Sequence, residues 1–147
     1  MSIRKISAFA CALFAIGLIA MAADEKKFKA TCPISGKAAL EDKTADHNGA
    51  KVYFCCGNCP KAFTADPAKY AVKANQQIVE TGQATQKKCP LSGGDLNKDA
   101  TVTIGETKVQ FCCNKCQGKV AEAKGDEQLK LVFSDEAFKK GFEVKKK

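Results

Sequence analysis

The sequence contains one cysteine-rich unit twice, and this duplication limits the possible folds more than any other feature. The first copy has a Cys-Pro-x-Ser-Gly segment at Cys32–Gly36 and a Phe-Cys-Cys-x-x-Cys segment at Phe54–Cys59. The second copy repeats them at Cys89–Gly93 and Phe111–Cys116, so each cysteine recurs 57 positions later. Of the 28 positions between the first and last cysteine of the first copy, 12 are identical in the second without a gap. The repeat predicts an architecture of two similar small units.

The first 23 residues have the pattern of a secretory signal. Arg4 and Lys5 give a positive start, and residues 6–23 carry no charge. Small residues at Ala20 and Ala22 match the positions that a signal peptidase recognises, which predicts cleavage near Ala22 or Ala23. An uncleaved membrane anchor is the alternative, because 18 uncharged residues just reach spanning length. We favour removal of residues 1–23, which predicts a periplasmic or extracellular protein without a stable membrane anchor.

The charge of the remaining chain argues against a nucleic-acid partner. It carries 22 lysines against 16 acidic residues, a net charge of +6, and its only arginine, Arg4, lies in the predicted signal. Lysine is a hydrated point charge without the planar fork of arginine that suits phosphates and base edges. The sequence also has no tryptophan and no run of aromatics on which bases would stack. We therefore expect the lysines, including the tail at 143–147, to form a solvated surface.

The first unit, predicted at 28–80, combines a turn, a hairpin and helices. Asn48-Gly49 is a strong two-residue hairpin signal and leads into a β-prone strand at Lys51–Phe54. Residues 58–65 form a predicted helix that begins beside the Cys-x-x-Cys segment. Asp66-Pro67 then reads as an N-cap followed by the first position of a helix that continues to about Glu80.

A linker at 81–88 is predicted to lead into the second unit, at 89–142. Strands are expected at Thr101–Ile104 and Thr107–Phe111, followed by helices at 114–123 and 127–133. Ser134 is expected to cap a last short helix that carries Phe138 and Phe142. The predicted fold class is therefore α+β, with two small units in one compact body. The expected shared core consists of Val52, Tyr53, Phe54, Phe63, Tyr70, Val109, Phe111, Phe133 and Phe138.

The cysteines are the main candidates for function. Eight remain after loss of Cys11 with the signal, and an exported small protein with an even number ordinarily uses them as disulfides. Metal binding is the competing hypothesis, because units of about 35 residues rarely have a sufficient core and metals or crosslinks supply the deficit. The layout brings a loop cysteine, Cys32 or Cys89, towards a helix start that stabilises thiolates. Soft thiolate clusters select zinc, copper(I) or iron–sulfur centres, of which iron–sulfur is the least suited to an exported site.

The spacing and the surrounding residues resemble the YHS/TRASH family of treble-clef-like modules associated with metal handling. The resemblance covers about 40 residues of the first unit, including Lys51–Cys55 and Asp66–Tyr70, and about 30 residues of the second. It implies treble-clef-like units that each bind zinc or copper. The metal ligands that it implies are Cys32, Cys55 and Cys59 in the first unit and Cys89, Cys112 and Cys116 in the second.

The fourth ligand of each site is left open. The position that would complete a treble-clef Cys-x-x-Cys knuckle is Ser35 in the first unit and Ser92 in the second. Structural zinc requires four ligands, and the adjacent Cys56 or Cys113 is the natural replacement, although neighbouring cysteines reach one ion only with backbone distortion. An open fourth position would instead suit metal sensing or transfer. We therefore include Cys56 and Cys113 among the candidate ligands.

Two hypotheses compete with an exported, non-enzymatic metal-binding protein. Cys56-Gly57-Asn58-Cys59 follows a strand and opens a helix, as the dithiol of a thiol–disulfide oxidoreductase does, but this leaves Cys32 and Cys55 unexplained. The other hypothesis is an interaction module held together by disulfides without metal. His47 is expected to be an exposed turn residue, because its counterpart in the second unit is Ile104. A protein partner is left open, and the sequence does not identify one.

Overall fold

The computed structural model describes residues 28–146, so the predicted signal at 1–23 lies outside the described residues. In the first unit, β1 (Leu40–His47) and β2 (Ala50–Phe54) form an antiparallel hairpin, followed by α1 (Asn58–Ala65). The connecting residues Asn48 and Gly49 have φ values of 49° and 82°. Two successive positive φ angles are typical of the tight hairpin turn that an Asn-Gly pair favours. The predicted hairpin is therefore confirmed.

The second unit repeats this arrangement with β4 (Asn97–Ile104), β5 (Thr107–Phe111) and α3 (Asn114–Glu122). The strands pair in the same register in both hairpins. Leu40 pairs with Phe54 in the first hairpin, and the residues 57 positions later, Asn97 and Phe111, pair in the second. Both hairpins also have an irregularity at the same place in the first strand. The sequence duplication is therefore also a structural duplication, and the α+β fold class is confirmed.

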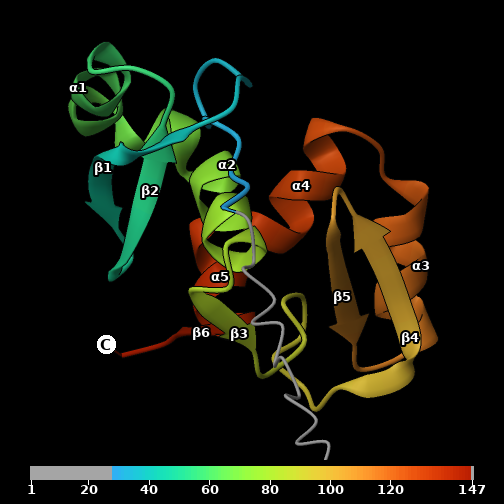
Figure 1. The fold of residues 1–147 in the computed structure, drawn as a ribbon. Coiled ribbons are helices and arrows are strands. Elements are labelled where there is room, and N and C mark those ends of the chain that lie inside the picture. The colour runs from blue at the N-terminus through green and yellow to red at the C-terminus, as the bar shows by residue number, and fades with distance from the viewer. Residues whose placement is uncertain (1–27, 147) are drawn as a thin grey trace, which may run out of the picture.

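Three further helices join the two units. They are α2 (Pro67–Glu80), α4 (Asp126–Phe133) and α5 (Asp135–Gly141). The Asp66 carboxylate accepts a hydrogen bond from the Lys69 backbone N–H, and Ser134 Oγ accepts one from the Ala137 N–H, so both predicted caps are present. Helix α2 packs against both β2 and α4, and it lies in the centre of the molecule (Figure 1).

A small third sheet differs from the sequence prediction. Strand β3 (Ala84–Gln86) lies within the segment expected as a linker and pairs antiparallel with β6 (Phe142–Val144). Phe142, expected on the last helix, instead has extended backbone angles and begins β6. Its ring stacks on Phe138 with 5.5 Å between the ring centroids. An extended backbone at this point lets residues 142–144 pair with β3 while the Phe142 ring stays buried.

One cluster of buried side chains draws on both units. It contains Phe54 and Phe63 from the first unit, Phe111 from the second, and Phe133 and Phe138 from the joining helices. Of the expected core, Val52 and Val109 are also buried, whereas Tyr70 is half-buried and packs at the edge of the cluster. Tyr53 is half-buried too but is not part of the cluster, and its ring packs edge-on against Phe28 with 4.7 Å between ring centroids. Both tyrosines remain partly exposed, as expected for aromatic residues whose hydroxyl groups need water or a polar partner.

The expectation for His47 is wrong, because its side chain is only 12% exposed. The imidazole packs edge-on against Phe63, with 5.4 Å between ring centroids, and its Nε2 lies 3.4 Å from the Asp135 carboxylate of α5. Asn48 Nδ2 lies 2.9 Å from Asn75 Oδ1 and 3.0 Å from Asp135 Oδ1. This polar cluster joins the first hairpin to α2 and α5. A sequence comparison of the two copies misses it because its partners lie far along the chain.

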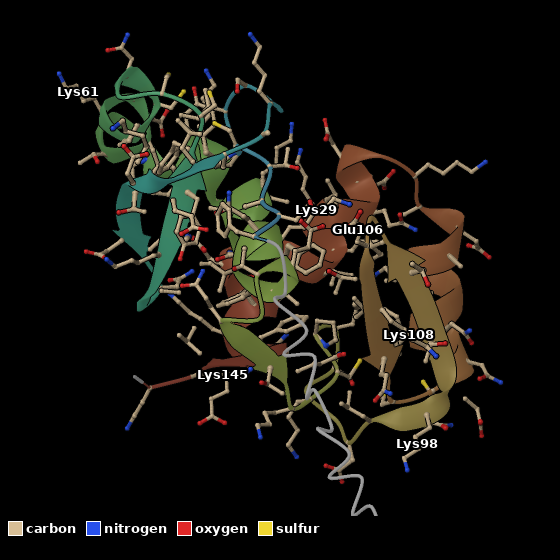
Figure 2. The ribbon with its side chains drawn as sticks, in the orientation of Figure 1. Lys29, Lys61, Lys98, Glu106, Lys108 and Lys145 are labelled. Carbon is tan, nitrogen blue, oxygen red and sulfur yellow. The ribbon has the colours of Figure 1, made fainter. Side chains whose placement is uncertain are left out.

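Lysines are spread over the surface rather than gathered on one face. Lys61, Lys98, Lys108 and Lys145 are exposed and come from α1, β4, β5 and the C-terminal segment (Figure 2). Within residues 28–146, no helix has the length and apolar character needed to cross a bilayer.

Gly141, at the end of α5, lies against the turn of the second unit. Its carbonyl accepts hydrogen bonds from the backbone N–H groups of Lys87 and Lys88. A Cβ atom at this position would lie 2.9 Å from Pro90 Cα and 3.1 Å from the Lys88 carbonyl oxygen. We therefore expect Gly141→Ala to lower the free energy of unfolding by about 1–3 kcal/mol, because the backbone has to move. Urea denaturation followed by circular dichroism measures this change.

Gly118 provides the matched control for this substitution. It lies inside α3, and a Cβ atom there would meet no other atom within 4 Å. Gly118→Ala is expected to raise the free energy of unfolding by about 0.5–1 kcal/mol, since alanine is the better helix former. Equal effects of the two substitutions would show that the contact between α5 and the second turn does not restrict position 141.

Candidate metal centres

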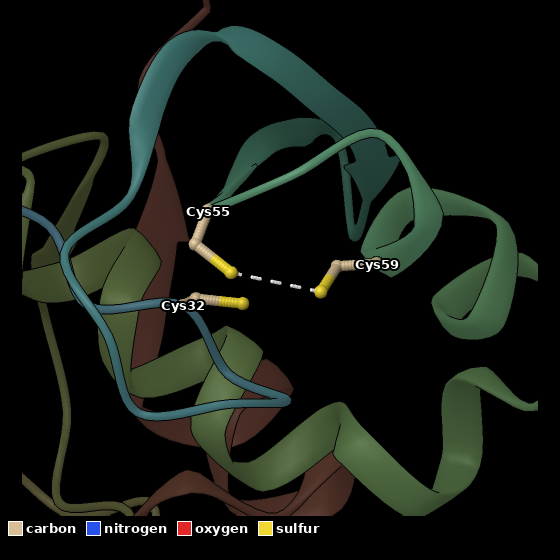
Figure 3. Close-up of side chains that lie close together, drawn as sticks. All are labelled: Cys32, Cys55 and Cys59. Atoms are coloured by element: carbon tan, nitrogen blue, oxygen red, sulfur yellow. Dashed lines mark hydrogen bonds between the residues drawn. The ribbon is translucent and has the colours of Figure 1, made fainter.

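Three cysteine sulfurs converge in the first unit from three different parts of the backbone. Cys32 lies in the turn before β1, Cys55 follows β2 directly, and Cys59 lies in the first turn of α1. Their Sγ atoms all lie within 4.8 Å of one another, and those of Cys55 and Cys59 are 3.7 Å apart (Figure 3). We call these three residues the first trio. Cys32 is 1% exposed and Cys59 is 8% exposed, so the trio is held largely inside the protein.

The second unit forms the same arrangement from equivalent residues. The Sγ atoms of Cys89, Cys112 and Cys116 also lie within 4.8 Å of one another, and those of Cys112 and Cys116 are 3.7 Å apart. We call these residues the second trio. Cys89 is fully buried, whereas Cys112 and Cys116 are half-buried. Each trio therefore offers three soft ligand atoms that can hold one metal ion.

A tight turn positions the first cysteine of each trio. In the first unit, the Gly36 N–H donates to the Cys32 carbonyl at 2.9 Å, and the Cys32 N–H donates to the Lys37 carbonyl at 2.7 Å. In the second unit, the Gly93 N–H donates to the Cys89 carbonyl at 2.7 Å. Both glycines have a positive φ, 71° and 73°, which a residue with a side chain rarely adopts. The Pro-x-Ser-Gly sequence thus forms the predicted turn and directs the cysteine sulfur inward.

Ser35 and Ser92 each contact a cysteine of their trio. From the sequence alone, they are only the positions where a fourth cysteine ligand is missing. Ser35 Oγ lies 3.1 Å from Cys55 Sγ, and Ser92 Oγ lies 3.1 Å from Cys112 Sγ. Each hydroxyl is therefore close enough to hydrogen-bond a thiol of its trio. The recurrence of serine at the same turn position in both copies was the signal for this contact.

Cys56 and Cys113 lie outside the two groups of mutually close sulfurs, although each is close to one member. Cys56 is exposed, and its Sγ lies 3.2 Å from Cys59 Sγ. Cys113 is half-buried, and its Sγ lies 3.6 Å from Cys112 Sγ. The two copies therefore differ in which member of the trio the additional cysteine approaches. Among residues 28–146, the structure contains no disulfide between the eight cysteines.

The first cysteine of each trio has a lowered pKa. Burial raises the pKa of the Cys32 thiol, but hydrogen bonds from the Ser35 side chain and from nearby backbone N–H groups outweigh burial and lower it to about 7. The same opposing causes, with Ser92 in place of Ser35, lower the pKa of Cys89 to about 7. These two thiols are therefore close to half-ionised at neutral pH without any metal.

The helix cysteine of each trio is shifted in the opposite direction. The hydrogen bond with Cys56, followed by burial and the neighbouring sulfurs Cys55 and Cys32, raises the pKa of Cys59 well above its usual value. Burial, followed by the hydrogen bond with Cys112, raises the pKa of Cys116 to about 12. One thiolate in each trio therefore makes the next ionisation unfavourable. A bound cation would remove this penalty by neutralising the thiolates.

Histidine is not part of either group, since both trios consist only of cysteine and His47 lies in the polar cluster described above. The six residues that the structure brings together are the six ligands that the resemblance implies, whereas Cys56 and Cys113 lie outside the two trios. In comparisons with known proteins, the chain matched no protein-family model, no curated protein and no solved structure. The geometry of the two trios is therefore the main basis for assigning a function.

Proposed function

We propose that this protein binds zinc or copper(I), with one ion in each trio, and that it sequesters, senses or delivers the metal. The observation that supports this most directly is the convergence of three sulfurs within 4.8 Å of one another at two equivalent places. Thiolate ligands favour zinc and copper(I) over hard cations such as magnesium and calcium. The similarity of the spacing to the YHS/TRASH family is consistent with this proposal.

The proposed use depends on the number of ligands. A structural zinc site is normally closed by four protein ligands, whereas a site with three keeps one position for another molecule. Three thiolates with an open position suit metal transfer, and recruitment of Cys56 or Cys113 would close the site. We propose that the protein acts outside the cytoplasm, on the basis of the charged start and uncharged stretch at residues 4–23.

Metal content and thiol content of the purified protein test the proposal together. We expect about two ions per chain by elemental analysis, one for each trio, with thiols that react fully only after chelation and denaturation. The preparation should exclude oxygen, because oxidation removes thiolate ligands. A protein with oxidised cysteines and no metal under these conditions would instead support the interaction module held together by disulfides.

The fourth ligand is tested by Cys56→Ser and Cys113→Ser. If the position is open, each variant should retain both ions and lose little affinity. If the additional cysteine closes the site, the variant should lose affinity for one ion, and the absorption spectrum of a cobalt-substituted protein should change. Cys113→Ser is the natural comparison for Cys56→Ser, because the two cysteines contact different members of their trios.

Metal affinity should depend on pH because the thiols lose protons when they bind the ion. The dependence should have two stages, because the two pKa shifts in each trio are opposite. Above pH 7 the Cys32 and Cys89 thiols are mostly ionised, so binding has to displace at least the proton of Cys59 or Cys116. Below pH 7 the Cys32 and Cys89 thiols are protonated as well, so one additional proton per site is displaced. We expect log affinity to fall with decreasing pH, and more steeply below pH 7 by about one unit per pH unit. Competition with a chromophoric chelator across pH 6 to 9 measures the slope, after correction for the protonation of the chelator. A constant slope would contradict the lowered pKa assigned to Cys32 and Cys89.

Thiol–disulfide exchange is the second candidate, and it rests on one observation in the first unit. Cys56 is exposed, and hydrogen bonds with the Cys59 side chain and with backbone N–H groups lower its pKa, whereas Cys59 is buried and only 3.2 Å away. An accessible thiolate beside a protected thiol is the arrangement of a dithiol reductant. The Cys56 thiolate would attack a substrate disulfide, and Cys59 would then displace the second substrate thiol. The substrate gains two electrons and two protons, and Cys56 and Cys59 become a disulfide that an external dithiol must reduce.

An assay of disulfide reduction separates the two candidates. A dithiol reductant should reduce a model disulfide such as that of insulin, and Cys56→Ser should abolish the activity. Under the metal proposal, the wild-type protein should instead show no turnover above that of free thiols, and metal should protect Cys59 from alkylation.

A further inference from the structure

Gln77 of α2 makes three hydrogen bonds to the backbone of the first unit, all within two residues of a cysteine of the first trio. Its Nε2 donates to the Thr31 carbonyl at 2.8 Å and to the Tyr53 carbonyl at 2.8 Å. Its Oε1 accepts from the Tyr53 N–H at 2.7 Å. Thr31 directly precedes Cys32, and Tyr53 lies two residues before Cys55. One side-chain amide therefore connects the backbone segments that carry two of the three sulfurs.

Gln86 of β3 makes the same three hydrogen bonds in the second unit. Its Nε2 donates to the Lys88 carbonyl at 3.2 Å and to the Gln110 carbonyl at 2.6 Å, and its Oε1 accepts from the Gln110 N–H at 2.9 Å. Lys88 directly precedes Cys89, and Gln110 lies two residues before Cys112. The backbone groups contacted by Gln86 are thus the 57-residue equivalents of those contacted by Gln77.

The two glutamines themselves are not equivalent positions of the repeat. The residue 57 positions after Gln77 is Ser134, and the residue 57 positions before Gln86 is Lys29. The duplicated sequence therefore does not account for the repeated contact. Each unit obtains its bridging amide from a different element of the segment between the two units, α2 in one case and β3 in the other. Because two unrelated positions of the sequence make the same hydrogen bonds, we infer that each cysteine site needs an amide that connects its two backbone segments.

The two glutamines differ in how far their side chains are buried. Gln77 is 1% exposed, so an apolar replacement would remove all three hydrogen bonds of this buried side chain, to the Thr31 carbonyl and to the N–H and carbonyl of Tyr53. Gln86 is half-buried, so water can replace its side chain as a hydrogen-bond partner more readily. The first site should therefore depend on its glutamine more strongly than the second.

The geometry points to Gln77 and Gln86 as positioning residues of the two proposed metal centres, each holding the turn cysteine and the strand cysteine of its own trio at the separation that a metal ion requires. This inference rests on the proposed metal-binding function. Neither glutamine contacts the ion. Each acts through the backbone, as the hydrogen-bonded groups around other metal centres act through the ligands that they orient.

The test uses proteins with one functional site, so that each affinity is measured alone. Cys116→Ser leaves the first trio intact, and Cys59→Ser leaves the second. Gln77→Leu and Gln86→Leu are then introduced into both backgrounds, and zinc and copper(I) affinities are measured in separate titrations against chromophoric chelators. Gln77→Leu is expected to weaken the first site roughly 10- to 100-fold and leave the second within about twofold, and Gln86→Leu is expected to do the reverse.

A purely structural role for the glutamines predicts a different result. If they only stabilise the fold, each substitution should lower the urea midpoint of the metal-free protein and weaken both sites alike, or neither. Either outcome would overturn the inference. Gln77→Glu and Gln86→Glu add a more conservative comparison, because a carboxylate still accepts from the backbone N–H but cannot donate to the two carbonyls, so affinity should fall at the same single site.

Two controls keep this inference separate from the proposed function. If the parent proteins with one trio bind neither zinc nor copper(I), the proposed function is wrong. If the parents bind metal and the glutamine variants bind equally well, only the positioning role is wrong. Should Gln77→Leu fail to fold, the half-buried Gln86 still decides the question, since Gln86→Leu must weaken the second site and not the first.

Discussion

Replacing Cys32 by serine is expected to weaken one of the two proposed metal sites by at least about 100-fold and to leave the other unchanged. The serine hydroxyl is a harder ligand and stays protonated at neutral pH, so only two thiolates of the first trio remain. Structural zinc in small cysteine sites is held by about 10–16 kcal/mol, and losing one of three ligands should cost at least about 3 kcal/mol, or about 100-fold in affinity. Elemental analysis and chelator competition on the purified variant measure the loss.

The duplication supplies the matched variant for this experiment. Cys89→Ser removes the equivalent ligand of the second trio, so each single variant should keep one site of full affinity and the double variant should keep neither. Loss of both ions in either single variant would show that the two sites do not bind independently. Two sites of unchanged affinity in Cys32→Ser would rule out the first trio as a metal site.

Truncating Phe133 is expected to cause the largest loss of stability in the metal-free protein. The side chain is fully buried, and its ring stacks on that of Phe142 with 5.9 Å between centroids. Phe133 ends α4, the helix that packs on α2 between the two units. Phe133→Ala should lower the free energy of unfolding by about 3–5 kcal/mol, since the cavity left behind cannot close completely. Domains of this size are stable by only about 5–15 kcal/mol, so a large part of the stability would be lost.

Urea denaturation in the presence of a chelator measures this loss without the contribution of bound metal. Leu40→Ala is the control, because Leu40 is 50% exposed and its truncation should change stability by no more than about 0.5 kcal/mol. Because the buried cluster draws on both units, we expect a single cooperative transition. Two separate transitions, with only one shifted by Phe133→Ala, would contradict a shared core.

Features that depend on neighbouring residues were predictable from the sequence. The Asn48-Gly49 pair predicted the first hairpin turn because asparagine and glycine tolerate the positive φ angles that it requires. Asp66 and Ser134 predicted two helix starts because their side chains cap the N–H groups a few residues later. The cysteine trios were predictable for a related reason, since turn, strand end and helix start each lie within a unit of about 28 residues.

Features that depend on distant residues were not predictable. Strands β3 and β6 have only three residues each, and their pairing joins positions 84–86 to 142–144. The position of His47 depends on α5, and comparison with Ile104 in the other copy pointed away from it. The position of the additional cysteine also differs between two copies of nearly the same local sequence. Cys56 lies beside the helix cysteine Cys59, whereas Cys113 lies beside the strand cysteine Cys112.

By itself, the sequence determined that the protein has two equivalent cysteine units, which elements carry the sulfurs, and that an α+β fold results. Local backbone preferences and the 57-residue period are sufficient for these conclusions, because each sulfur is placed by its own turn, strand end or helix start. Only the tertiary structure decided that β3 pairs with β6 and that Gln77 and Gln86 connect the backbones beside the trios. The physical reason is that buried backbone groups take the nearest available partner in space, and that partner has no fixed position in the sequence repeat.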